Sequence, residues 1–116
     1  LYASREDHIV PWKGAYASTR VFKGKKRFML GASGHIAGVI NPPAKGKRNY
    51  WVGKLAADAD RWLERAEDVP GSWWPAWMDW LGEHAGRLVA APKSAGSRQH
   101  KPIESAPGRY VKAKAP

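Results

Sequence analysis

The stretch "RFMLGASGHIAG", residues 27–38, places an apolar run directly before a loop that holds one histidine among glycines and alanines. Phe28, Met29 and Leu30 form a continuous apolar run, which is typical of a strand covered on both faces. The small residues that follow allow tight turns and leave room around His35. We therefore expect a buried strand that ends in a loop presenting the His35 ring to another group.

The residues before this strand predict that it belongs to a parallel sheet. Residues 1–12 indicate a strand end followed by a polar turn, with Pro11 marking where regular pairing stops. Between residues 12 and 22, apolar side chains recur near helical spacing and predict a short amphipathic helix. A crossover between parallel strands needs a dozen or more residues, and this interval supplies them. The order of strand, helix and strand predicts an α/β fold with a mostly parallel sheet and flanking helices.

Residues 58–86, "DADRWLERAEDVPGSWWPAWMDWLGEHAG", predict two helices broken at Pro70 and Gly71. Ser72 is a suitable N-cap, and Pro75 is tolerated in the first turn, where amides lack intrahelical partners. The second helix carries an aromatic stripe at i, i+4 and i+7 spacing, made by Trp73, Trp77 and Trp80 together with Trp74, Met78 and Leu81. We expect this stripe to dock the helix onto the sheet, in preference to forming a ligand platform.

Length and composition set limits on the protein. With 116 residues, 43% of them hydrophobic, and seven tryptophans, the chain can form one small domain or part of one. Because it opens at Leu1, in what reads as the end of a strand, we expect a piece of a longer protein. No apolar run approaches the roughly 18 residues of a membrane span, and no signal peptide is recognisable, so we expect a soluble, cytoplasmic protein. Cysteine is absent, which excludes a disulfide, a cysteine-based zinc site and a thiol nucleophile within these residues.

The chain carries a formal net charge of +10. Basic residues cluster at Lys23 to Arg27 and Lys45 to Arg48, in predicted loops, and again after residue 86, where Ala, Pro, Gly, Ser and Lys predict a basic, partly extended tail. Such charge attracts polyanions, and candidates are nucleic acid, phosphate-bearing cofactors and an anionic particle surface. For any single cluster a solvated surface is the favoured interpretation. A nucleic-acid-binding module stays an alternative, although no recognition-helix, zinc or RNP-type motif is present.

Asp7 is the best partner for His35. Ser33 is a poor nucleophile candidate, because His35 occupies the position where the G-x-S-x-G motif needs its closing glycine. Asp7 and His35 each follow a predicted strand end, and functional groups of parallel sheets gather beyond the carboxyl ends of the strands. A carboxylate bonded to Nδ1 of a histidine fixes its tautomer and leaves Nε2 to act as a base. A helix-capping Asp and a structural His are the bland alternatives, and spacing alone does not exclude them.

Four motifs together resemble one family. "SREDHIVPW", "GASGHIAGVINPP", the "WL…GSWWPAWMDWL" helices and "APGRYVKAKA" are similar, in this order, to the C-terminal portion of class I polyhydroxyalkanoate synthases. These are bacterial polymerases of 3-hydroxyacyl-CoA thioesters, and the resemblance covers nearly the whole chain. It implies that residues 1–86 are the C-terminal, incomplete part of an α/β-hydrolase catalytic domain and that residues 87–116 are its basic tail.

The resemblance also implies a Cys-His-Asp triad in which Asp7 and His35 are the catalytic acid and base. The cysteine would lie upstream of these residues, so the piece alone should be inactive. His35 would help to form the thiolate that attacks a substrate such as 3-hydroxybutyryl-CoA and releases CoA. Asp7 would either orient His35 or assist deprotonation of the 3-hydroxyl group. His8, next to Asp7, is interpreted as structural, since adjacent side chains of an extended segment point opposite ways.

Further expectations follow from the same resemblance. The partners would be the growing polyester, a second copy of the full-length protein and the surface of a cytoplasmic polymer granule. No metal is expected, and no cofactor apart from the CoA thioester substrate. An esterase or lipase of the α/β-hydrolase class stays open as an alternative, because it would keep the same Asp and His and use a serine nucleophile.

Overall fold

The computed structural model describes residues 1–115, which divide into a unit of residues 1–86 and a second unit that begins at Arg87. The elements of the first unit, in chain order, are β1 (Tyr2–Ser4), α1 (Trp12–Val21), β2 (Met29–Gly31), the short 3₁₀ helix η1 (Pro43–Lys45), β3 (Asn49–Val52), α2 (Ala59–Arg65), β4 (Glu67–Pro70) and α3 (Trp74–Ala85). In the second unit, the described residues form one 3₁₀ turn, η2 (Tyr110–Lys112), and are almost all exposed. Within residues 1–115 no helix has the length and apolar character that a membrane crossing requires.

The four strands form one mixed sheet in the order β1-β2-β3-β4. β1 runs parallel to β2, with Tyr2 beside Met29, and the helix between them is α1. This confirms the predicted strand, helix and strand. β3 pairs antiparallel with both β2 and β4, so the expectation of a mostly parallel sheet is wrong for these four strands.

The connection from β3 to β4 returns to the end of the sheet at which β3 stops, with Val52 paired to Glu67. A Cβ atom added to Gly53, directly after β3, would lie 3.3 Å from the Cα atom of Ala66, directly before β4. The chain therefore leaves β3, forms the seven residues of α2 and returns to the same end of the sheet, so that α2 is not a crossover. The sequence predicts residues 67–70 as the end of a helix broken at Pro70 and Gly71, and this expectation is wrong, because these residues form β4. Pro70 instead closes an outer strand, a position where a missing N–H group is tolerated.

The core lies between the sheet and the helices α1 and α2. Phe28 and Leu30 are buried, as predicted for this strand. The Phe28 ring packs edge-on against Tyr16 of α1 and Trp62 of α2, with ring centroids 4.9 Å apart in both pairs. The Tyr16 hydroxyl also donates a hydrogen bond to the carbonyl of Ala56 and accepts one from its N–H group. Aromatic packing and these two bonds together hold α1 against the segment that leads into α2.

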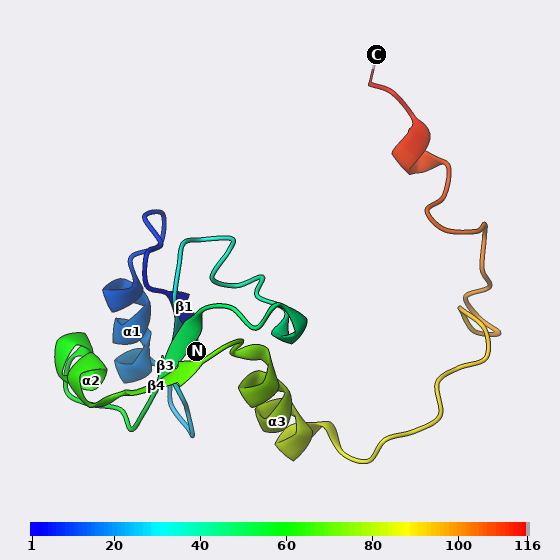
Figure 1. Cartoon of the computed structure of the whole chain (residues 1–116). Coiled ribbons are helices and arrows are strands. Elements are labelled where there is room, and N and C mark those ends of the chain that lie inside the picture. The colour runs from blue at the N-terminus through cyan, green and yellow to red at the C-terminus, as the bar shows by residue number, and fades with distance from the viewer. Residues whose placement is uncertain (116) are drawn as a thin grey trace. The chain divides into compact units, whose positions relative to one another are not determined.

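Helix α3 lies on the other side of the strands from α1 and α2 (Figure 1). The predicted helix is present, and the Ser72 hydroxyl accepts a hydrogen bond from the Trp74 N–H group at its start. No residue of α3 is buried, however, and Trp77, Met78 and Trp80 are 42%, 58% and 38% exposed. The expectation that the aromatic stripe forms core is therefore wrong for this chain. The core is formed on the face that α1 and α2 cover, and within residues 1–86 no further layer covers α3.

Candidate functional site

Asp7 and His35 meet beyond the ends of the two parallel strands. β1 ends at Ser4 and β2 at Gly31, and parallel strands present their carboxyl ends at the same edge of a sheet. The Oδ2 atom of Asp7 lies 2.7 Å from the Nδ1 atom of His35. The Asp7 side chain is 8% exposed and that of His35 46%. The structure thus brings together the two residues that the sequence predicts as partners.

The Asp7 carboxylate is fixed by its own backbone. Its Oδ1 atom accepts hydrogen bonds from the N–H groups of Ile9 and Val10, each 2.9 Å long, which closes a turn after β1. α1 begins only at Trp12 and has no side-chain cap. Asp7 is therefore not the cap of that helix, and its Oδ2 atom is left to face His35.

Electrostatics keep Asp7 ionised. The hydrogen bond from the Val10 N–H group, with those from His35 and the Ile9 N–H group, lowers the pKa of Asp7 to about 2, although burial acts in the opposite direction. An ionised carboxylate only accepts hydrogen bonds, so Nδ1 of His35 carries the proton between the two groups. In the neutral ring Nε2 then has a free lone pair. The pair has the geometry of a general base oriented by a carboxylate.

Close packing shapes the loop that carries His35. Ser33 has a left-handed backbone, with φ of 79°, and its carbonyl accepts a hydrogen bond of 3.1 Å from the Glu6 N–H group. A side chain at Gly38 would overlap the Ser4 hydroxyl of β1. This glycine is needed for close approach between the loop and β1. Gly34, by contrast, leaves ordinary space for a Cβ atom, 3.6 Å from the nearest carbonyl oxygen.

Side chains from later in the chain hold the far end of this loop. The indole N–H groups of Trp73 and Trp74 both donate to the carbonyl of Val39, at 3.2 and 2.9 Å. The Arg48 guanidinium donates to the carbonyl of Ala37. None of these three contacts was predicted, because the tryptophans were expected in the core and Arg48 in a solvated basic loop. A side chain that donates to a distant carbonyl leaves no periodic signal in a sequence.

An apolar cavity of about 440 Å³ opens beside the Asp7–His35 pair. Its lining includes both residues of the pair together with Val10, Ile36, Val39 and Ile40. These aliphatic side chains are exposed. The site therefore combines one oriented imidazole with an accessible apolar wall. His8 is exposed and does not line this cavity.

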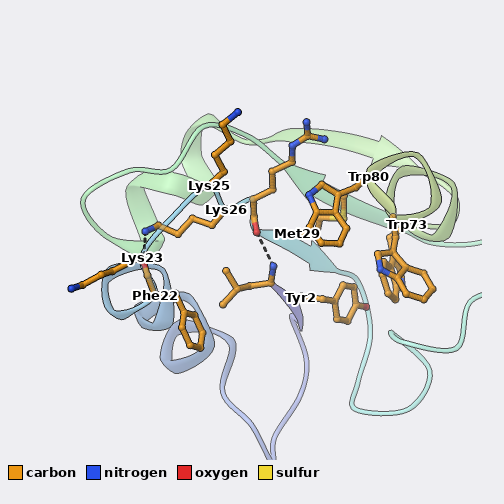
Figure 2. Close-up of a pocket in the computed structure, with 11 residues that line it drawn as sticks. Tyr2, Phe22, Lys23, Lys25, Lys26, Met29, Trp73 and Trp80 are labelled. Atoms are coloured by element: carbon orange, nitrogen blue, oxygen red, sulfur yellow. Dashed lines mark hydrogen bonds between the residues drawn. The ribbon is translucent and has the colours of Figure 1, made fainter. Parts of the chain in front are cut away.

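A second cavity, of about 470 Å³, lies between the basic loop after α1 and helix α3 (Figure 2). Figure 2 shows Lys23, Lys25 and Lys26 on one side of it, and Trp73 and Trp80 on the other. Tyr2 of β1, Met29 of β2 and Trp77 of α3 also line it. Neither Asp7 nor His35 lines it. Among residues 1–115 no group of three or more acidic, His or Cys side chains is placed to hold a metal ion.

These features define an α/β protein with a carboxylate-oriented histidine at the carboxyl end of its parallel strands. No protein-family model matches the sequence. The chain is 58% identical, over 99% of its length, to the poly(3-hydroxyalkanoate) polymerase subunit PhaC of Cupriavidus necator. It is 50% identical, over 94% of its length, to the protein of the same name in Rhizobium etli, and 42% identical, over 94%, to poly(3-hydroxyalkanoate) polymerase 1 of Ectopseudomonas oleovorans. The chain belongs to the poly(3-hydroxyalkanoate) polymerase family, as predicted, and it covers 20%, 17% and 20% of these three relatives.

Proposed function

We propose that this chain supplies the acid and the base of a polyhydroxyalkanoate synthase, which polymerises 3-hydroxyacyl-CoA into a polyester and releases CoA. The observation that carries the proposal is the 2.7 Å contact from Asp7 to Nδ1 of His35, which leaves Nε2 available as a base. The nucleophile would be a cysteine outside these residues, in a Cys-His-Asp triad. The four strands would be the last part of an α/β-hydrolase sheet, and residues 87–116 a basic tail.

In this function the proton moves between sulfur and His35. Nε2 takes the proton of the cysteine thiol, and the thiolate attacks the carbonyl carbon of the thioester. The bond between that carbon and the CoA sulfur breaks, and CoA leaves with the proton returned by His35. The 3-hydroxyl group of one acyl unit then attacks the acyl thioester of another. His35 accepts the hydroxyl proton, an ester bond forms and the thiolate is released.

We assign to Asp7 the orientation of His35, not the deprotonation of the 3-hydroxyl group. Three hydrogen bonds already occupy its two oxygens, from Ile9, Val10 and His35. With a pKa of about 2, its carboxylate is also a weak base at neutral pH. A weak base that is already hydrogen-bonded at both oxygens is suited to holding an imidazole and stabilising its protonated form.

The apolar cavity supports an acyl substrate. Ile36, Val39 and Ile40 offer aliphatic contacts next to His35, which suits the hydrocarbon part of a 3-hydroxyacyl group. In the full-length protein we assign as further partners the growing polyester, a second copy of the protein and the surface of a polymer granule in the cytoplasm. These partners follow from the family and rest on the same proposal.

The first test is CoA release from 3-hydroxybutyryl-CoA by the full-length protein that carries this chain. His35→Ala should abolish release, because it removes the base. His8→Ala is the matched control: this histidine is adjacent to Asp7, exposed and outside the cavity, and its variant should release CoA at the rate of the unmodified protein. Sustained CoA release by His35→Ala would overturn the assignment. Hydrolysis of simple esters without polymer would favour an esterase or lipase.

A further inference from the structure

We propose that Trp73 and Trp74 are positioning residues for His35, acting through the backbone carbonyl of Val39. The inference rests on the proposed function, because it assigns a role within the same site. Its basis is a juxtaposition: two consecutive indole N–H groups at the start of α3 converge on one carbonyl in the loop that carries His35.

Backbone hydrogen bonds link the residues around Val39 to those around His35. Hydrogen bonds of 2.9 Å from the Gly38 N–H group to the Gly34 carbonyl and from Ile40 to Ile36 give the intervening segment two helix-like turns. These two bonds tie the residues on either side of His35 to those on either side of Val39. Fixing the Val39 carbonyl therefore also restricts where the His35 ring lies.

Trp73 contacts both segments that supply the pair. Its ring stacks on Tyr2 of β1, with centroids 4.2 Å apart and planes 28° from parallel, and β1 leads directly into the turn of Asp7. Its N–H group reaches Val39, beyond His35. One side chain thus links the acid segment to the base loop. Trp74 adds the shorter bond to the same carbonyl, which also accepts a hydrogen bond of 3.2 Å from the Asn41 N–H group.

Neither tryptophan belongs to the buried core, although the Trp73 ring stacks on Tyr2 and its centroid lies 5.5 Å from that of Trp77. Trp73 and Trp74 are half-buried, and no residue of α3 is buried. Trp77, on the same helix, supplies the comparison. It lies in the aromatic stripe and is 42% exposed, and no hydrogen bond from its indole is present within residues 1–115. What distinguishes Trp73 and Trp74 is the pair of bonds to the His35 loop.

The test uses the full-length protein with Trp73→Phe and Trp74→Phe, singly and together, and Trp77→Phe as the matched control. Phenylalanine keeps an aromatic ring and removes the N–H donor. The double variant should lower kcat for CoA release by about tenfold to a hundredfold with KM nearly unchanged, since small misplacements of a catalytic group cost up to about a hundredfold. In each single variant kcat should fall less, because one indole N–H donor to the Val39 carbonyl remains. Trp77→Phe should leave kcat unchanged.

A readout independent of turnover separates this inference from the proposed function. In protein labelled with ¹⁵N-histidine, the Nδ1 proton that His35 shares with Asp7 gives a deshielded NMR resonance, identified by its loss in His35→Ala. This resonance should broaden or disappear in the double variant and persist in Trp77→Phe. If it persists in the double variant, or if kcat there is unchanged, the positioning role is refuted. If His35→Ala retains turnover while the double variant loses the resonance, the positioning role stands and the proposed function fails.

Discussion

At the scale of single residues, the two oxygens of Asp7 have separate tasks. Oδ1 holds the turn that follows β1, through the N–H groups of Ile9 and Val10, and Oδ2 holds the imidazole of His35. The same carboxylate therefore shapes the backbone and orients the base. Substitutions that keep one task and remove the other can distinguish them.

Asp7→Asn should keep the turn and damage the site. The amide oxygen can still accept from Ile9 and Val10, but the NH₂ group then faces Nδ1 of His35 and favours the tautomer with its proton on Nε2. That tautomer cannot accept the thiol proton, so kcat for CoA release should fall by about 10⁴-fold, the scale found when a triad aspartate becomes asparagine. Asp60→Asn is the control, since Asp60 is an exposed carboxylate paired with Lys13. Equal rates for both variants would contradict the orienting role.

The titration of Asp7 offers a second prediction at this scale. Its pKa is lowered from 3.8 to about 2 in the folded chain, chiefly by the Val10 N–H group and also by His35 and Ile9. A depressed pKa favours the folded state above pH 4, and this contribution is lost as the pH falls through about 2. The ¹³C shift of the Asp7 carboxyl carbon should therefore titrate near pH 2. A midpoint near 3.8 would show that the turn and the His35 contact are absent in solution.

At the scale of elements, the apolar faces of α2 and α3 differ in what covers them. Trp62 of α2 is buried against Tyr16 and Phe28, whereas Trp77 of α3 is 42% exposed. The helical spacing of the sequence marks both faces as apolar. Periodicity shows that a face is apolar, but it does not say which element lies against it. For this reason the aromatic stripe was predicted as core and is found beside a cavity.

Replacing Trp62 or Trp77 by alanine should lower the free energy of unfolding by clearly different amounts. Trp62→Ala should lower the free energy of unfolding by about 3 to 5 kcal/mol, because it empties the centre of the aromatic core. Trp77→Ala should cost about 1 kcal/mol or less, as is usual for exposed positions. Urea unfolding of the two variants, followed by tryptophan fluorescence and circular dichroism, measures both values. Similar losses for the two would show that α3 is packed as tightly as α2.

The length and sequence pattern of each element explain which strands were predicted. β1 and β2 were found because an apolar run, a helical interval and a loop followed one another over 30 residues. β3 and β4 have four residues each, which is too short to show a clear alternation of polar and apolar side chains. β4, "EDVP", also carries two acids and a proline. The proximity of Asp7 and His35 followed from topology together with the family resemblance, because spacing alone left a helix cap and a structural histidine open. The bonds to Val39 did not, since they depend on where α3 lies.

At the scale of the whole molecule, the family signal extends over more of the chain than the candidate site does. Four motifs spread over nearly all of the chain predicted the family, which sequence identity of 58% to one relative confirms. The candidate site uses two short segments of the first unit. The net charge of +10, by contrast, points to anionic partners in general and selects none.

The strands lie in the sheet in the order in which the ribosome makes them. No strand has to insert between two that are already paired, so the sheet can grow by addition at one edge while synthesis proceeds. Among these four strands, the longest connection, and therefore the costliest to close, is the one that joins β1 to β2 across α1. That closure also brings Asp7 to His35. Among these four strands, the acid and the base therefore come together in the one pairing that requires none of β3, β4 and α3.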